Sequence, residues 1–236
     1  MQNKIYIVDR RYFDAISAFF GKGRIILPSF PCMALDKPVS CHPDMVLFSP
    51  EKGTLICANE VFADYQNLLS PYGVRLVQGK SRLRRDYPKD IAYNVLHTTV
   101  GAFAKFDSTD SQIMNFLEKH HVQKHNVNQG YARCSTVSFA SAVITADAGI
   151  EKAGLAAGLS VLKVQPGFVL LPGYQYGFLG GASGIIDDDT IAFFGDLSSH
   201  PDGEAIRKFI HAKGYSLCEI AGQPLIDIGT IFCIEL

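Results

Sequence analysis

One order of elements recurs along the 236-residue sequence: a strand, a tight turn, a second strand, a helix and a third strand. Clear copies cover residues 44–49, 54–57, 60–69 and 73–77; residues 135–139, 142–145, a helix from 148 and 158–162; and residues 184–186, 190–194, 203–212 and 214–218. A weaker copy covers residues 94–100, 102–105, 110–119 and a strand near 122. Short strands alternating with helices indicate an α/β fold, and similar successive units indicate an internal repeat.

The two ends of the chain supply a fifth unit between them. Residues 228–234 form a lone first strand, and residues 4–8, 11–20 and 23–27 supply the missing second strand, helix and third strand. Pairing the last strand with the first closes a ring and removes open sheet edges. The sequence therefore predicts a single domain over residues 1–236, a five-fold pseudosymmetric α/β propeller of strand–strand–helix–strand repeats.

Composition favours a small-molecule partner. The 22 Lys and Arg nearly balance the 23 Asp and Glu, and a net charge of −1 provides no overall field for nucleic acid or an anionic membrane. The six cysteines form no C-x-x-C pair, no zinc-like cluster occurs, and no run of 18 apolar residues is present. We expect a cytoplasmic protein with free thiols, no cofactor, no metal and no membrane or nucleic-acid partner; the oligomeric state stays open.

In such a ring, the starts of the five first strands converge on the axis. Aligning those strands brings together His42 and Asp44, His97, Cys134 and Thr136, Gly180 and Gly181, and Asp227. Side chains two residues apart on a strand point to the same side, so His42 and Asp44 are expected to face the site together, as are Cys134 and Thr136. A thiol, two imidazoles and two carboxylates are thus predicted to share one cavity.

Cys134 is the preferred nucleophile, because it has Arg133 beside it and a cation or histidine lowers a thiol pKa. His42 is the candidate acid and base. Cys233 is a competing thiol that lies deeper in its predicted strand. Any of these residues also has a structural interpretation, as a small core cysteine or a hydrogen-bonded histidine.

The remaining site candidates bind substrate. Asp44 and Asp227 could hold a cationic group, since a buried cation needs paired carboxylates, although both could be solvated at strand ends. The glycine-rich stretch 172–184 lacks the ending of a phosphate loop and indicates close backbone approach or a flexible rim. The basic stretch 80–85 is interpreted as a solvated loop rather than an anion clamp.

Five strand-and-helix units around a channel, with Cys and His at first-strand starts, resemble the pentein or guanidine-modifying superfamily, which includes arginine deiminases, agmatine deiminases and dimethylarginine hydrolases. His42-Pro-Asp-Met-Val46 resembles its His-x-Asp strand and Gly130-Tyr-Ala-Arg-Cys134 its Gly-x-x-Arg-Cys nucleophile. Their separation, 134 − 42 = 92 residues, is two repeat lengths. The resemblance implies that Cys134 attacks a guanidinium carbon, and that His42 moves protons and activates water to release a covalent thiouronium intermediate.

Two features depart from that family. Its acidic-Gly-Gly-acidic turn reads Leu179-Gly-Gly-Ala182 here, and the nucleophile lies in the third unit, as in a circular permutation. Three functions follow as hypotheses. The first is a cysteine-dependent hydrolase or transferase of a small guanidino or amidine compound. The second is a non-catalytic ring that binds a protein, a ribosome or a small ligand, and the third is a Cys-His hydrolase of amides.

Overall fold

The computed structural model describes residues 4–21, 23–220 and 222–236. The strands are β1 (Lys4–Val8), β2 (Ile25–Pro28), β3 (Leu47–Glu51), β4 (Thr54–Cys57), β5 (Arg75–Gln78), β6 (Leu96–Thr98), β7 (Gly101–Ala104), β8 (Lys124–Asn126), β9 (Thr136–Phe139), β10 (Ala142–Thr145), β11 (Ser160–Lys163), β12 (Ser183–Ile185), β13 (Thr190–Phe193), β14 (Ser216–Glu219) and β15 (Phe232–Glu235). The α-helices are α1 (Phe13–Phe20), α2 (Phe62–Leu69), α3 (Ser111–Lys119), α4 (Ala148–Ala156) and α5 (Gly203–Ala212).

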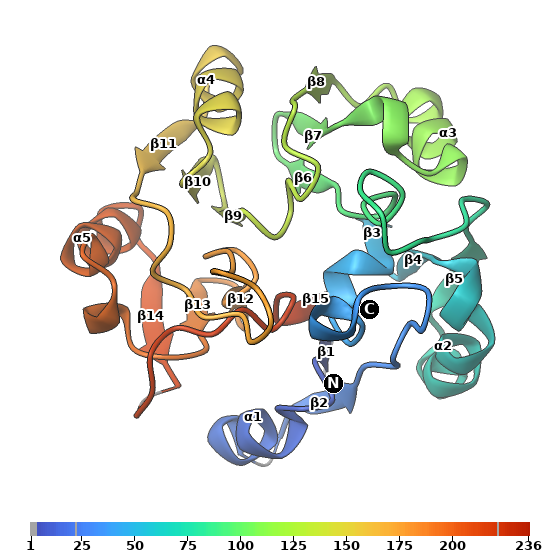
Figure 1. Cartoon of the computed structure of the whole chain (residues 1–236), viewed down its shortest axis with the longest axis horizontal. Helices are drawn as coiled ribbons and strands as arrows, with labels where there is room; N and C mark the ends of the chain where they lie inside the picture. Colours follow the sequence, from blue (N-terminus) through green and yellow to red (C-terminus); the bar gives the residue numbers. More distant parts are fainter. Residues whose placement is uncertain (1–3, 22, 221) are drawn as a thin grey trace.

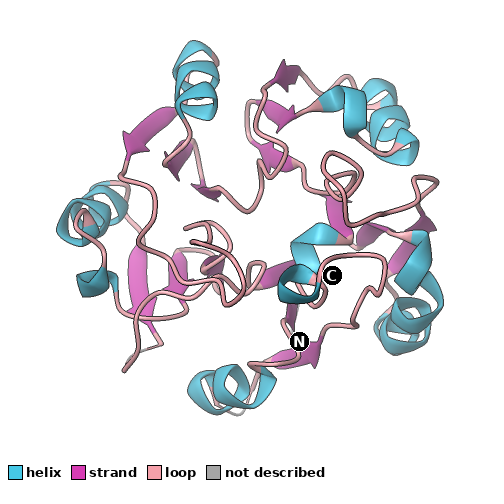
Figure 2. Cartoon of the chain, in the orientation of Figure 1, coloured by secondary structure: helices cyan, strands magenta, loops and turns pink. Residues whose placement is uncertain are grey.

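Within the described residues the strands form five three-stranded sheets around a ring, with the α-helices on its outer side (Figures 1 and 2). In every sheet the first strand of the unit runs antiparallel to the second, and the second runs parallel to the third. The predicted α/β propeller of five units is confirmed.

The predicted split of the fifth unit is also confirmed. Strand β15 pairs antiparallel with β1, in a register that sets Lys4 opposite Glu235 and Ile7 opposite Phe232. Strand β1 then pairs in parallel with β2. The two ends of the chain therefore lie close together in one sheet (Figure 1), and this pairing closes the ring.

Local sequence explains the elements of each unit. The second strands β4, β7 and β10 are buried along their whole length, because the outer helix covers one face and the ring interior the other. Asp110 caps α3 by accepting a hydrogen bond from the Gln112 amide, and Asp147 caps α4 by accepting one from the Ile150 amide. Gly158 follows α4 with a φ of 88°, a conformation that favours glycine.

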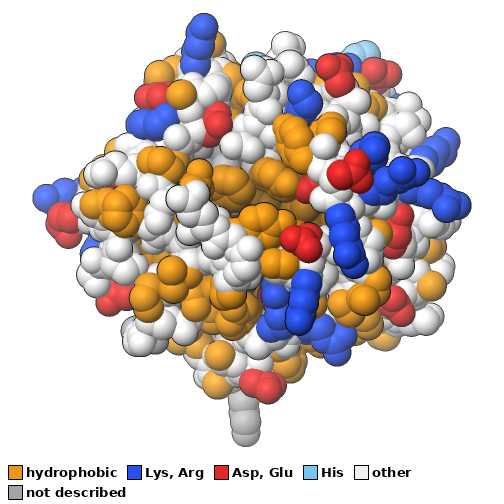
Figure 3. Space-filling model, viewed as in Figure 1, with side chains coloured by type: hydrophobic (Ala, Val, Ile, Leu, Met, Phe, Trp, Pro, Cys, Tyr) orange, Lys and Arg blue, Asp and Glu red, His pale blue; other side chains and the backbone are white. Residues whose placement is uncertain are grey.

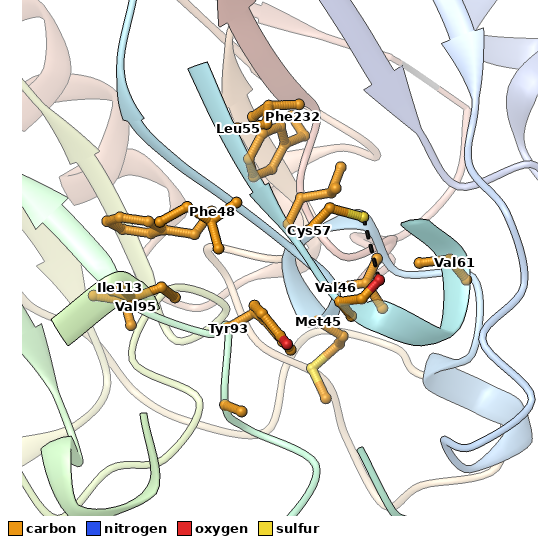
Figure 4. Packing of buried hydrophobic residues seen from close by; sticks show 14 of the residues in the cluster. Met45, Val46, Phe48, Leu55, Cys57, Val61, Tyr93, Val95, Ile113 and Phe232 are labelled. Atoms are coloured by element: carbon orange, nitrogen blue, oxygen red, sulfur yellow. Dashed lines mark hydrogen bonds between the residues drawn. The ribbon is translucent and has the colours of Figure 1, made fainter. Parts of the chain in front are cut away.

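The largest apolar cluster joins three neighbouring sheets. It includes Ile5 of β1, Leu55 of β4, Ala102 of β7 and Phe232 of β15, all buried. Figure 4 shows part of this cluster, with Phe48 of β3, Leu55 and Phe232 among its labelled side chains. Close packing across the sheet boundaries fixes the spacing of the units and so the positions of the segments that lead into each first strand.

Four of the five first strands begin later than the sequence pattern predicts, whereas β12 begins one residue earlier, at Ser183. The strand expected over 44–49 begins at Leu47, because Pro43–Met45 form a 3₁₀ turn with proline at its first position. The strand expected over 228–234 begins at Phe232, because Gly229 and Thr230 have φ angles of 66° and 77°, which bend the backbone away from an extended form. The expectation that His42 and Asp44 share one face of a strand was therefore wrong, since both precede the strand.

Candidate active site

Six buried polar side chains meet on one side of the ring: Asp9, His42, Asp44, Asn94, Cys134 and Asp227. Asp9 directly follows β1, and the other five lie in the segments that lead into first strands. Sequence analysis selects four of the six and misses Asp9 and Asn94. The missed signal for Asn94 is spacing, because it stands two residues before β6 as Cys134 stands two residues before β9.

Cys134 is 3% exposed and its thiol makes two hydrogen bonds. The thiol donates to Asp44 Oδ2 over 3.0 Å, and its sulfur accepts from Asn94 Nδ2 over 2.9 Å. The Asn94 side chain also holds the local backbone, since its Oδ1 accepts from the amides of Arg133 at 2.8 Å and Cys134 at 3.2 Å. One amide side chain thereby positions both the sulfur and the turn that carries it.

His42 is 1% exposed and lies between two carboxylates. Its Nε2 is 3.8 Å from Asp9 Oδ2, and its Nδ1 is 3.7 Å from Asp227 Oδ1. Both distances exceed a hydrogen bond, and Nε2 has no hydrogen-bond partner among the described residues. Gly229 packs closely against the His42 side chain, so that a Cβ at position 229 would overlap His42. The imidazole is therefore held in place by packing rather than by a hydrogen bond to either carboxylate.

The buried carboxylates differ in the groups that stabilise their negative charge. Asp9 forms an ion pair with Arg11, which also donates from Nη2 to the Pro38 carbonyl at 2.8 Å. Asp227 accepts from the amides of Phe178 at 2.8 Å and Gly229 at 3.0 Å, and no described Lys or Arg pairs with it.

Asp44 likewise lacks a Lys or Arg partner among the described residues, and its Oδ1 makes no hydrogen bond there. Two buried carboxylates thus face Cys134 and His42 without a cation in direct contact.

Burial controls the protonation of the site. It raises the pKa of Asp44 to about 6, and burial together with the neighbouring Asp44 charge raises the pKa of Asp227 to about 7. Burial lowers the pKa of His42 to about 3, with Arg11 adding to the effect, and burial raises the pKa of the Cys134 thiol well above its usual range. Without a ligand, the thiol and imidazole are neutral near pH 7, Asp44 is mostly ionised and Asp227 is close to its midpoint.

A cavity of about 230 Å³ opens onto Cys134, His42 and Asp227. The rest of its lining is Val39, Met45, Tyr131, Leu171, Tyr174, Gln175, Tyr176 and Phe178. Most of these side chains are apolar or aromatic, and the described lining contains no Lys or Arg. Figure 3 shows hydrophobic side chains gathered near the middle of the ring on the face drawn in Figure 1, with Lys and Arg groups mainly below and to the right.

A family model described as a family of unknown function, DUF6873, matches residues 7–232. The chain belongs to DUF6873. No curated protein matches the sequence. The family model therefore fixes membership of DUF6873 without naming an activity, and further likeness comes from solved structures.

Three solved structures share the fold of this DUF6873 protein. One is dimethylarginine dimethylaminohydrolase in an adduct with S-methyl-L-thiocitrulline, with TM-score 0.56 and 10% identity over 93% of this chain and 92% of that one. The inosamine-phosphate amidinotransferase StrB1 of Streptomyces griseus has TM-score 0.55 and 12% identity, over 93% and 88% of the two chains. The amidinotransferase SxtG of Microseira wollei, from the saxitoxin biosynthetic pathway, has TM-score 0.51 and 13% identity, over 87% and 74%. These structures confirm the predicted pentein-like fold.

Gly180 and Gly181, the two predicted substrate-binding glycines, pack against the backbone of Cys134 and the side chain of Asp227. The Gly181 amide donates to the Cys134 carbonyl at 2.7 Å, and a Cβ at Gly181 would overlap the carboxylate of Asp227. A Cβ at Gly180 would overlap the carbonyls of Cys134 and Thr136. Thr136 is fully buried, and its hydroxyl has no partner in the described part of the chain. Gly180 and Gly181 are therefore required to be glycine, because backbone carbonyls approach the first closely and the Asp227 side chain approaches the second.

Three other candidates line a cavity different from that of Cys134. His97, Arg133 and Cys233 line a second cavity of about 290 Å³ in the ring interior, and none of them lines the cavity of Cys134. Burial lowers the pKa of His97 and raises the pKa of Cys233 to about 12.

No group of three His, Cys, Asp or Glu within residues 4–21, 23–220 and 222–236 is arranged to hold a metal ion. Among the described helices, none combines the length and apolar character that crossing a membrane requires.

Proposed function

We propose that the protein is a cysteine-dependent hydrolase or transferase of a small guanidino or amidine cation. The observation that carries the proposal is a thiol, a neutral imidazole and two carboxylates without Lys or Arg partners, gathered beside one mostly apolar cavity. An amidinium ion in the cavity would supply the missing positive charge and donate N–H groups to the carboxylate of Asp227, which lines the cavity. The folds of a dimethylarginine hydrolase and two amidinotransferases are consistent with this chemistry.

The proposed reaction proceeds through a covalent thiol intermediate. The Cys134 thiol transfers its proton to His42, and the thiolate attacks the central carbon of the amidinium group. The C–N bond to the leaving amine breaks while His42 returns that proton to the nitrogen, so that a cationic S-linked thiouronium or thioimidate remains. His42 then takes a proton from water, or from an acceptor amine in a transferase. The resulting nucleophile adds to the carbon, and the C–S bond breaks to release thiolate, which recovers its proton.

Cation binding would prepare the thiol for this step. Burial is the main cause of the raised pKa of Cys134, and the charges of Asp44 and Asp227 add to it by disfavouring a nearby thiolate. A bound amidinium ion compensates those carboxylates and places positive charge next to the sulfur. The Asn94 amide, already 2.9 Å from the sulfur, stabilises the thiolate by donating a hydrogen bond to it. The nucleophile is thus expected to be activated by the substrate itself.

The cavity lining supports an apolar substituent on the substrate. Tyr131, Tyr174, Tyr176 and Phe178 offer aromatic surface, and the described lining contains no cation that could pair with a substrate carboxylate. We therefore propose amidines or guanidines with an apolar or aromatic tail in preference to free arginine.

A second candidate function is ligand or protein binding without chemistry. The segment before β12 exposes Phe168, Leu170, Tyr174 and Tyr176 by 40–52%, and such apolar exposure is typical of binding surfaces. A neutral thiol engaged in two hydrogen bonds also suits a structural role. Reactivity toward a cationic alkylating reagent separates the two functions.

The test compares two small reagents of nearly equal shape, cationic 2-chloroacetamidine and neutral 2-chloroacetamide. Mass spectrometry of peptides identifies the modified cysteine and its rate. We expect Cys134 to react much faster with the cationic reagent than with the neutral one. Asp44→Asn should reduce this preference for the cation, and His42→Ala should reduce the rate of the reaction. Cys233→Ser is the matched control and should change neither. Equal, slow rates for both reagents at Cys134 would leave the binding function as the better account.

A further inference from the structure

The second cavity lies where the first strands of all five units converge (Figure 1). Its lining comes from β3, β6, β9, β12 and β15, together with residues that precede these strands, Lys52 of the β3–β4 turn and Lys4 of β1. These residues are Lys4, Leu47, Phe48, Ser49, Lys52, Val95, Leu96, His97, Arg133, Ser138, Ile185, Ile231, Phe232, Cys233 and Glu235. We call this cavity the central channel.

Positive charge exceeds negative charge in the central channel. Lys4, Lys52 and Arg133 line it, against the single carboxylate of Glu235. Lys4 forms an ion pair with the exposed Asp188, whereas Lys52 and Arg133 make no ion pair with any described residue. The cavity therefore holds uncompensated cations in its described lining.

Arg133 is the central group of this arrangement. Its half-buried guanidinium donates one hydrogen bond to protein, from Nη1 to the Thr136 carbonyl at 3.3 Å. The remaining N–H groups have no partner among the described residues. Burial lowers the pKa of Arg133, and the electrostatic effects of Asp44 and Cys134 oppose that shift by raising it. A guanidinium in this situation is well suited to bind an oxyanion with two parallel hydrogen bonds.

Neutral donors accompany the cations. The half-buried hydroxyls of Ser49 and Ser138 line the same cavity and form no hydrogen bonds with the described residues. The apolar side chains of Phe48 and Phe232 form part of the wall, and a surrounding of low polarity strengthens electrostatic attraction.

We propose that the central channel binds a small multivalent oxyanion of the phosphate type, with Arg133 and the hydroxyls of Ser49 and Ser138 as its donors and Lys52 as a further cation. The site is separate from that of Cys134. Arg133 and Cys134 are adjacent in sequence, yet each lines a different cavity. Oxyanion binding should therefore persist when the thiol is removed, and it does not depend on the proposed catalytic function.

The probe is inorganic phosphate, titrated into the full-length protein by isothermal titration calorimetry at constant ionic strength, with sodium chloride as the reference salt. We expect saturable binding to the wild type and to Cys134→Ser. Arg133→Met should weaken binding at least tenfold, and Ser138→Ala and Lys52→Gln should each weaken it several-fold. Arg85→Met is the matched control, because Arg85 is an exposed arginine outside the channel lining.

Three results would overturn the proposal: no heat beyond that of chloride, wild-type affinity in Arg133→Met, or loss of binding in Cys134→Ser. If Arg133→Met fails to fold by circular dichroism, the two milder variants decide. Unchanged phosphate affinity in both of them would then refute the site, and weaker affinity in both, with Arg85→Met unchanged, would support it.

Discussion

The protonation of Asp44 and Asp227 predicts how the affinity for an amidine depends on pH. A cation binds the ionised carboxylates, so affinity should rise as the pH increases through their pKa values. With a pKa of about 7, Asp227 is about 10% ionised at pH 6 and about 90% at pH 8, a roughly tenfold change. Asp44, with a pKa of about 6, adds a factor of about two. The affinity should therefore increase about twentyfold between pH 6 and pH 8.

Benzamidine is a suitable ligand, because it stays cationic over this range and its ring matches the aromatic lining of the cavity. Calorimetry with the Cys134→Ser protein excludes any reaction at the thiol. The neighbouring His42 does not titrate in this range, since burial lowers its pKa to about 3. Asp227→Asn should lower the affinity at pH 8 and leave only the twofold dependence of Asp44. The neutral analogue benzamide is the control and should bind equally at both values of pH.

Two results would refute this reasoning. Equal benzamidine affinity at pH 6 and pH 8 would mean that the carboxylates do not titrate as their burial requires. An unchanged pH dependence in Asp227→Asn would mean that another group binds the cation.

Three further predictions concern stability and reactivity. The raised pKa of Asp227 makes the folded state less stable as pH rises from 4 to 7. Asp227→Asn should therefore increase the free energy of urea unfolding of the unliganded protein at pH 8, by at most a few kcal/mol, and should not increase it at pH 4. Asn94→Ala should slow alkylation of the Cys134 thiol by chloroacetamidine. It should also lower the free energy of urea unfolding by about 1–3 kcal/mol, because two backbone amides lose their acceptor. Gly229→Ala should lower the melting temperature more than Gly222→Ala, since both have positive φ but only a Cβ at Gly229 meets His42.

The sequence predicts the fold well because its units repeat the same turn and capping signals. Glycines after helices and short buried second strands recur in successive copies, so each unit supports the assignment of the others. The split fifth unit follows from the same pattern, because residues 4–27 lack a first strand and residues 228–234 supply one.

The site is less predictable, since convergence depends on the phase of each first strand. In the weak second unit, the run 94–100 does not reveal whether Asn94 or His97 stands in the position of Cys134. The structure brings Asn94 to the sulfur and His97 into the central channel, a difference of three residues. Asp9 is missed for another reason. It follows a second strand, and the loop after β2 brings His42 back to that strand end, where the Ser29 hydroxyl accepts from the Arg10 amide and donates to the Cys41 carbonyl.

Arg133 stands between the two cavities and links their electrostatics. Its charge lowers the pKa of Asp44, opposing the larger effect of burial. Arg133→Met in the Cys134→Ser background should therefore move the Asp44 contribution to benzamidine binding toward higher pH. The same substitution removes a repulsion between Arg133 and the bound cation, so affinity at high pH should increase slightly while the midpoint shifts.

Phosphate bound in the central channel should shift this midpoint in the same direction, because it compensates the charge of Arg133. Calorimetry at several pH values, with and without saturating phosphate, measures both effects. An unshifted midpoint in Arg133→Met would show that Arg133 and Asp44 are electrostatically independent. If the midpoint shifts in Arg133→Met but not when phosphate binds to the wild-type arginine, only the charge of Arg133, and not bound phosphate, affects Asp44. The two cavities would then act separately, although adjacent residues of one turn line them.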